Sequence, residues 1–254
     1  MLAGQRVGLV VPTLNEGDSI AGALSSVPRG IVDRIVVADG GSVDETVDRA
    51  RAAGAEVVHV GRGYGRACWD GAQKVAKDCS IIAFMDGDGA DRVDLIGELV
   101  GPIARGEQDF VLGSRTRGQR ELGSMGAHQI LAGRVVGWVL APSTGVVYTD
   151  MSAFRAIRRE ALLALGMREM TFGWNVEMQV RGPRQGLRVL EVPVPYSNRL
   201  GGRSKVAGSI KGTLKATINI CSTLIRVLCE PAMPGLIVSN SESDEESTRS
   251  AQEF

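Results

Sequence analysis

The chain has 254 residues, of which 44% are hydrophobic and 23% are charged, and this composition is typical of a globular protein with a sizeable buried core. Its 29 basic and 29 acidic residues balance, which excludes a strongly basic chain, so we expect no nucleic-acid partner. The last fifteen residues hold five acidic residues and one basic residue, which leaves 28 basic against 24 acidic residues elsewhere and mildly favours anionic ligands.

Cysteine, histidine and hydropathy patterns narrow the class of protein further. The four cysteines lack the spacing of metal ligands, and two histidines are too few for a histidine-based zinc site, so we expect free thiols in an intracellular protein. No signal peptide is evident, and no apolar run reaches about eighteen residues. We therefore expect a cytoplasmic protein without a transmembrane helix, with peripheral contact to the inner face of a membrane as the alternative.

The first half of the chain alternates short apolar runs with helical patterns. Apolar runs predict strands at 7–12, 34–38, 56–60 and 80–85, and amphipathic spacing predicts helices that begin near 15, 44 and 66. Strands separated by such helices form βαβ units, and these units build a largely parallel sheet with right-handed crossovers. The sequence thus predicts an α/β fold with a mostly parallel central sheet flanked by helices.

The second half of the chain is less regular. Its patterns predict strands at 110–112, 153–157 and 187–194, and helices at 93–104, 126–140, 160–165, 172–181 and 208–229. Polar loops rich in Arg and Gly are expected at 114–124 and 196–206. We expect 1–206 to form one domain, 207–229 to form an amphipathic helix packed on that domain or on a membrane surface, and 239–254 to be a disordered acidic tail.

Three carboxylates crowd the turn that follows the fourth predicted strand. Asp86, Asp88 and Asp91 lie beside glycines, and like charges at this spacing raise one another's pKa unless a cation binds between them. Oxygen ligands on a glycine-rich turn suit a hard divalent ion, Mg²⁺ or Mn²⁺, better than zinc. An acidic turn that caps the next helix is the alternative interpretation, and Asp91 in particular suits such a cap.

Carboxylates also follow the first and second predicted strands, namely Glu16, which stands beside Asn15, and Asp39. Because the carboxyl ends of parallel strands meet at one edge of a sheet, these residues and the pair Asp86 and Asp88 should converge in one crevice. There a carboxylate can accept a hydrogen bond from a ribose hydroxyl or a base N–H, and the pair can hold a metal on a diphosphate. Taken singly, each cluster is also explained by a helix cap or a turn.

Seven segments of the chain together resemble the motifs of family-2 glycosyltransferases. They are Val11-Pro12-Thr13-Leu14-Asn15-Glu16, Val37-Ala38-Asp39-Gly40-Gly41-Ser42-Val43-Asp44-Glu45-Thr46, Met85-Asp86-Gly87-Asp88, Gly113-Ser114-Arg115, Asp150-Met151-Ser152-Ala153-Phe154-Arg155, Glu191-Val192-Pro193-Val194 and Gly201-Gly202-Arg203-Ser204-Lys205. Over about residues 5–210 the sequence most resembles the dolichyl- and polyprenyl-phosphate sugar synthases of that family. The resemblance implies the GT-A fold, a UDP- or GDP-sugar donor, a Mg²⁺ or Mn²⁺ ion, and inversion at the anomeric carbon.

The resemblance also implies roles for residues at the nucleoside. Pro12, Thr13 and Glu16 would contact the nucleoside, with Glu16 toward the ribose, and Asp39 would read the base.

A second group of residues would handle the phosphates. The resemblance implies that Asp86 and Asp88 bind the metal and the donor diphosphate, and that Arg115 lies near the phosphates. Arg203 and Lys205 would close over the donor or acceptor phosphate. A metal with Arg and Lys side chains would stabilise the charge that develops on the departing nucleoside diphosphate.

The acceptor is less narrowly predicted. A polyprenyl phosphate is already an anionic nucleophile and needs no general base, and the basic loops would offset its repulsion from the donor. A hydroxyl of a soluble metabolite or glycan needs a base, and the candidates are Asp150 and Glu177, although Glu177 could equally pair with Arg181 at i+4. Further alternatives are a nucleotidyltransferase, or a sugar-nucleotide-binding domain without catalysis.

Two features depart from the resemblance. Ala153 stands where the family usually has glycine, which leaves the local backbone geometry open. The sequence also lacks the C-terminal transmembrane pair of many polyprenyl-phosphate synthases, so a lipid acceptor would require peripheral docking, for example through 208–229.

Overall fold

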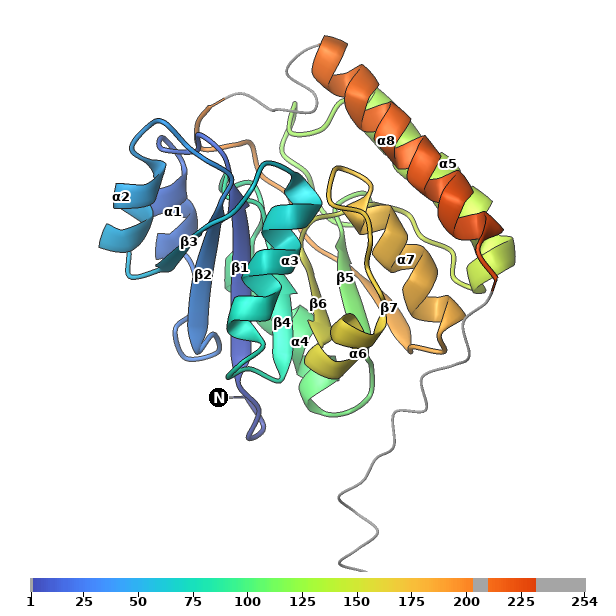
Figure 1. Cartoon of the computed structure of the whole chain (residues 1–254), viewed down its shortest axis with the longest axis horizontal. Helices are drawn as coiled ribbons and strands as arrows, with labels where there is room; N and C mark the ends of the chain where they lie inside the picture. Colours follow the sequence, from blue (N-terminus) through green and yellow to red (C-terminus); the bar gives the residue numbers. More distant parts are fainter. Residues whose placement is uncertain (1, 203–209, 232–254) are drawn as a thin grey trace, which may run out of the picture.

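A sheet of seven strands forms the centre of the computed structural model, which describes residues 2–202 and 210–231 (Figure 1). In spatial order the strands are β3 (Glu56–His59), β2 (Arg34–Asp39), β1 (Val7–Thr13), β4 (Ile81–Phe84), β6 (Arg155–Arg158), β5 (Phe110–Ser114) and β7 (Val189–Pro193). Neighbouring strands are parallel except at β6, which runs antiparallel to both β4 and β5. The predicted mostly parallel sheet is confirmed, and the antiparallel strand is a feature that hydropathy patterning does not encode.

Helices cover both faces of this sheet. They are α1 (Ile20–Ser25), α2 (Thr46–Ala52), α3 (Tyr64–Val75), α4 (Ile96–Ala104, after a short 3₁₀ turn at Val93–Leu95), α5 (Ala127–Thr144), α6 (Arg159–Ala164), α7 (Trp174–Arg184) and α8 (Ile210–Cys229). Side chains of a strand alternate between faces, so Leu9 and Val11 of β1 join the core under α1 and α4, whereas Val10 joins the core under α3 and α7. Among the described residues, no helix is both long and apolar enough to cross a bilayer.

Two glycines of α5 let this helix approach the chain beside Asp150. A Cβ atom at Gly137 would lie only 1.8 Å from the Tyr148 carbonyl oxygen, and one at Gly133 would lie 3.3 Å from the Thr149 carbonyl oxygen. The backbone at 148–150 therefore rests directly on the helix.

Replacing Gly137 by alanine is expected to lower the free energy of unfolding by about 1–3 kcal/mol, because the added methyl group displaces backbone rather than a flexible side chain. Urea denaturation measures the difference. Gly30→Ala is the matched control, since a Cβ atom there meets nothing within 4 Å. Equal stability of the two variants would contradict the close approach of α5.

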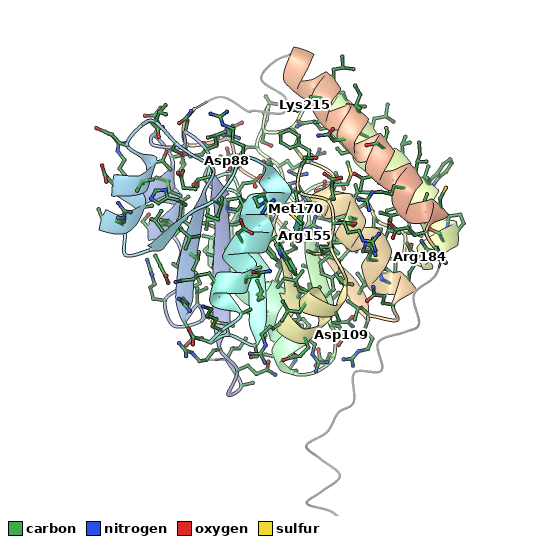
Figure 2. The ribbon with its side chains drawn as sticks, viewed as in Figure 1. Asp88, Asp109, Arg155, Met170, Arg184 and Lys215 are labelled. Atoms are coloured by element: carbon green, nitrogen blue, oxygen red, sulfur yellow. The ribbon has the colours of Figure 1, made fainter. Side chains whose placement is uncertain are left out.

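Asp109 forms ion pairs at the end of the sheet's strands that lies opposite Asp88. Figure 2 shows the two residues at opposite ends of the strands. The Asp109 carboxylate accepts hydrogen bonds from Arg188 Nε and Nη2, both at 2.9 Å, and from Arg158 Nη1 at 2.8 Å. Burial acts to raise the pKa of Asp109, but the hydrogen bonds from Arg188 and Arg158 outweigh it and hold the pKa well below 3.8.

Because this folded-state pKa is depressed, the stabilisation by Asp109 is present above the unfolded-state pKa and is lost as the pH falls toward the folded-state pKa. Asp109→Asn is expected to cost about 1–3 kcal/mol of unfolding free energy at pH 7. The gap between parent and variant should shrink as the pH falls below about 4. Urea denaturation over a pH series measures both effects, and a gap that stays constant with pH would contradict the assignment.

Candidate functional site

The loops that follow β1 and β2 are joined by hydrogen bonds into one rim. Ser42 Oγ accepts from the Asn15 N–H at 2.8 Å, and Asn15 Oδ1 accepts from the Val43 N–H at 2.9 Å. Thr46 Oγ1 accepts from the Glu16 N–H at 2.8 Å. Asn15 has a positive φ of 50°, a conformation that Asn adopts more readily than most residues. The polar residues after the first two strands therefore build the rim as well as facing it.

Asp39 is buried at the end of β2 and organises its own turn. Its Oδ2 accepts from the N–H groups of Gly41 at 3.1 Å and Ser42 at 3.0 Å, and its Oδ1 accepts from Ser42 Oγ at 2.5 Å. Thr13 Oγ1, at the end of β1, lies 3.5 Å from Asp39 Oδ1. Asp39 therefore forms the turn that was the alternative interpretation of this cluster. Its recognition of a base stays a prediction.

One guanidinium connects the ends of β1 and β4. Arg199 Nη1 lies 2.5 Å from Asp88 Oδ2, and Arg199 Nη2 lies 3.1 Å from each carboxylate oxygen of Glu16. Glu16 and Asp88 are 8% and 3% exposed, so the two charges are nearly removed from water. The convergence of these strand ends is confirmed, and the bridging arginine comes from the loop after β7.

The remaining carboxylates of the turn after β4 repel one another. Burial raises the pKa of Asp86, and the charges of Asp88 and Asp91 raise it further. Burial and the charge of Asp88 likewise raise the pKa of Asp91. Asp91 Oδ2 accepts from the Asp86 N–H at 3.1 Å, so this side chain closes the turn behind it. The helical segments that follow, Val93–Leu95 and Ile96–Ala104, begin without a side-chain cap, so the expected capping of the next helix by Asp91 is wrong.

The described residues contain no group of three or more His, Cys, Asp or Glu side chains arranged to hold a metal ion by itself. Asp86 and Asp88 therefore offer carboxylate oxygens for part of a coordination shell, and a bound ligand would have to complete it. Carboxylate oxygens crowded in this way fit a hard divalent cation, because such an ion removes the repulsion between them.

Arg115 and Asp150 form a buried ion pair beside this turn. The Asp150 carboxylate accepts from Arg115 Nε at 2.7 Å, Nη2 at 2.8 Å and the Arg115 N–H at 2.9 Å. The Arg115 guanidinium also lies 4.9 Å from the centre of the Tyr196 ring. Burial would raise the pKa of Asp150, but Arg115 lowers it below its ordinary value. A carboxylate in this state is a weak base, and its geometry instead fixes the direction of the Arg115 side chain.

Glu177 lies at the junction of α7 and α8, where it is fully buried. Its carboxylate accepts from Arg181 Nε at 3.0 Å, from the N–H groups of Arg168 and Glu169, and from Arg226 Nη2 at 3.2 Å. The i+4 pair with Arg181 is therefore present. The structure brings Glu177 together with α8 and not with the carboxylates at the sheet edge.

The sequence indicates Arg199 only as one of the basic loop residues that could offset the repulsion between donor and acceptor, and not as a partner of Glu16 and Asp88. Nothing local indicates a partner 183 positions away. Two other predicted residues, Arg203 and Lys205, and the predicted tail at 239–254 lie outside the described residues.

The chain is similar to several known proteins. The profile of Glycosyl transferase family 2 matches residues 9–166. An uncharacterized glycosyltransferase of Mycobacterium tuberculosis is 35% identical over 223 residues, which is 86% of this chain and 97% of the relative. The undecaprenyl-phosphate mannosyltransferase of Micrococcus luteus is 29% identical over 232 residues, covering 85% of this chain and 92% of the relative.

A solved structure shares the fold. Glucosyl-3-phosphoglycerate synthase from Mycobacterium tuberculosis, in complex with Mn²⁺, UDP and glucosyl-3-phosphoglycerate, superposes with a TM-score of 0.72 at 26% identity. The match covers 90% of this chain and 82% of the synthase. The same synthase has also been solved with Mg²⁺ and UDP.

Proposed function

Because the chain belongs to glycosyl transferase family 2 and has the GT-A fold, we propose that it transfers a sugar from a nucleoside diphosphate donor to a polyprenyl phosphate, with inversion. The observation that carries this proposal is that the neighbouring parallel strands β1, β2 and β4 have their carboxyl ends on the same side of the sheet. Glu16, Asp39 and Asp88 gather there, and this is the edge at which open α/β sheets bind nucleotides.

The nucleoside would lie on the rim built by the loops after β1 and β2. Pro12 and Thr13 end β1 beside Asp39, and Glu16 would accept a hydrogen bond from the ribose. Because these loops are cross-linked by hydrogen bonds, the rim is ordered before a donor arrives, and little ordering entropy is lost on binding.

Asp86 and Asp88 would hold Mg²⁺ or Mn²⁺ against the donor diphosphate, and their donor chemistry fits such an ion. When bound, the ion would offset the charge that develops on the departing nucleoside diphosphate. Arg115, fixed by Asp150 in a direction set by three hydrogen bonds, would hold a second positive charge near the phosphates. Arg203 and Lys205 would add charge from the loop after β7.

The state of the two candidate bases supports an acceptor that is already ionised. Asp150 is engaged by Arg115 with a lowered pKa, and Glu177 is buried among arginines and backbone donors. A phosphate oxygen needs no proton removed at neutral pH, whereas a sugar or metabolite hydroxyl does. The Micrococcus luteus relative is named for a lipid-phosphate acceptor of this kind.

A soluble, phosphate-bearing metabolite with a hydroxyl nucleophile is the second candidate acceptor. The structural neighbour is named for glucosyl transfer to 3-phosphoglycerate and has been solved with phosphoglyceric acid. Asp150 is then the candidate base, and it would have to be released from Arg115.

Radiolabelled UDP- and GDP-sugars, incubated with Mn²⁺ and either polyprenyl phosphate or 3-phosphoglycerate, test the proposal. We expect label in the organic extract with polyprenyl phosphate and none when the metal is chelated. Label only in a water-soluble product would favour the second candidate. Failure of every donor and acceptor, with UDP and GDP also unbound in calorimetry, would reject a nucleotide-sugar site.

A further inference from the structure

The outer sides of α5 and α8 are unusually apolar for a surface. Among the described residues, seven of the twelve most exposed large apolar side chains lie on these two helices. We call them the outer apolar face: Leu131, Val135, Trp138 and Val139 of α5, and Leu214, Ile218 and Ile225 of α8. Trp138 is 83% exposed, and Ile225 is 65% exposed.

The inner sides of the same helices already account for their packing on the domain. Val136 and Leu140 of α5 and Val227 of α8 enter one hydrophobic cluster with α7, so both helices lie on the same flank of the molecule (Figure 1). A surface helix normally turns its apolar side to the core and its polar side to water, whereas these two helices also carry large apolar side chains on the outer side. Among the described residues, no other part of the chain covers the outer apolar face. This face is therefore available to a further partner.

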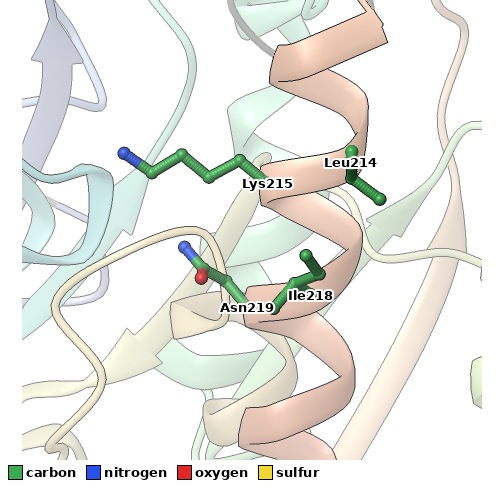
Figure 3. Close-up of a pocket in the computed structure, with 4 residues that line it drawn as sticks. All are labelled: Leu214, Lys215, Ile218 and Asn219. Carbon is green, nitrogen blue, oxygen red and sulfur yellow. The ribbon is translucent and has the colours of Figure 1, made fainter.

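Charge on these helices has one sign. Neither Ala127–Thr144 nor Ile210–Cys229 contains an aspartate or a glutamate. Arg134 and Lys215 are exposed, and neither forms an ion pair with the described residues. Figure 3 shows Lys215 and Asn219 pointing to one side of α8 and Leu214 and Ile218 to the other, around a hollow of about 240 Å³.

We propose that the outer apolar face docks on an anionic membrane surface. This inference rests on the proposed lipid-phosphate acceptor, because an enzyme that uses such an acceptor requires contact with the membrane that contains it. Apolar side chains and Trp138 enter the boundary between headgroups and acyl chains, while Arg134 and Lys215 meet lipid phosphates. A second copy of the chain is the weaker fit, because it brings the same cations and no acidic residue from these helices to pair with them.

Flotation with vesicles tests the docking in the absence of donor and acceptor. The full chain should bind vesicles of phosphatidylcholine with about 30 mol% phosphatidylglycerol, and bind pure phosphatidylcholine at least about tenfold more weakly. Trp138 emission should shift to shorter wavelength on binding, and Trp138→Phe should remove that shift. The double variant Leu131→Ser/Trp138→Ser should lower the partition coefficient at least about tenfold.

Leu163→Ser is the matched control, since Leu163 is 45% exposed on α6, away from the outer apolar face, and it should bind vesicles like the parent. Arg134→Gln/Lys215→Gln should weaken binding to the anionic vesicles and leave the weak binding to phosphatidylcholine unchanged. Absence of binding to anionic vesicles overturns the proposal. A dimer in sedimentation that dissociates in Leu131→Ser/Trp138→Ser also overturns it, in favour of a contact between copies. Vesicle binding without transfer to polyprenyl phosphate would instead leave the docking intact and remove the lipid acceptor.

Discussion

Replacing Asp88 by asparagine is expected to lower kcat/KM for sugar transfer by at least about 10³-fold. The amide keeps the shape of the carboxylate and can still accept the hydrogen bond that Asp88 Oδ1 receives from the Ala90 N–H at 2.9 Å. It removes the negative charge that pairs with Arg199 in this structure and would hold the metal on the donor. Steady-state kinetics with Mn²⁺ and a UDP- or GDP-sugar measure the loss.

Calorimetry separates this loss from a general effect on folding. The parent should bind the donor more tightly with Mn²⁺ than without, and Asp88→Asn should lose that difference. Asp94→Asn makes the same chemical change in an exposed ion pair with Arg92, and it should keep both the activity and the Mn²⁺ dependence. An Asp88→Asn variant that melts like the parent and retains Mn²⁺-dependent affinity would reject the assignment of the metal site.

The placement of the site followed from periodicity, because short apolar runs between helices predict parallel strands. Parallel strands put their carboxyl ends on one edge, so Glu16, Asp39 and Asp88 could be expected together before any coordinates. The prediction rested on strand direction and not on strand order. The sheet places β1 between β2 and β4 because the order reverses after β3, and periodicity does not indicate that reversal. The antiparallel β6 breaks that regularity, and its four residues carry no pattern that indicates direction.

Electrostatic partners were harder to predict than positions. Asp150 and Glu177 were both candidate bases, since a carboxylate in a sequence motif carries no sign of its hydrogen-bond partners. The structure pairs Asp150 with Arg115 and Glu177 with Arg181 and Arg226, across 35, 4 and 49 positions of sequence. Of these, only the i+4 spacing of Glu177 and Arg181 is visible in the sequence.

Removing the charge of Arg199 should strengthen the binding of Mn²⁺ and weaken catalysis. Its guanidinium lies between Glu16 and Asp88, and its buried Nε has no hydrogen-bond partner among the described residues. A divalent cation that approaches Asp88 must displace this charge or bind beside it. Arg199→Gln is therefore expected to bind Mn²⁺ at least about tenfold more tightly in the absence of nucleotide, since a repulsion worth about 1.4 kcal/mol corresponds to that factor.

The same substitution should lower kcat/KM about 10²-fold, because a fixed cation beside the donor phosphates is lost when charge develops on them. Electron paramagnetic resonance of free Mn²⁺ measures the first effect, and transfer kinetics measure the second. Arg92→Gln is the control, since Arg92 is half-exposed and pairs with Asp94 outside the basic loops. Arg199→Lys keeps the charge but cannot bridge both carboxylates in the same way, so its Mn²⁺ affinity should fall between parent and Arg199→Gln. The competition between Arg199 and the metal for Asp88 would be contradicted if Arg199→Gln lowers activity but leaves the affinity for Mn²⁺ unchanged. In that case Arg199 binds the donor, and the metal binds beside an arginine that keeps its position.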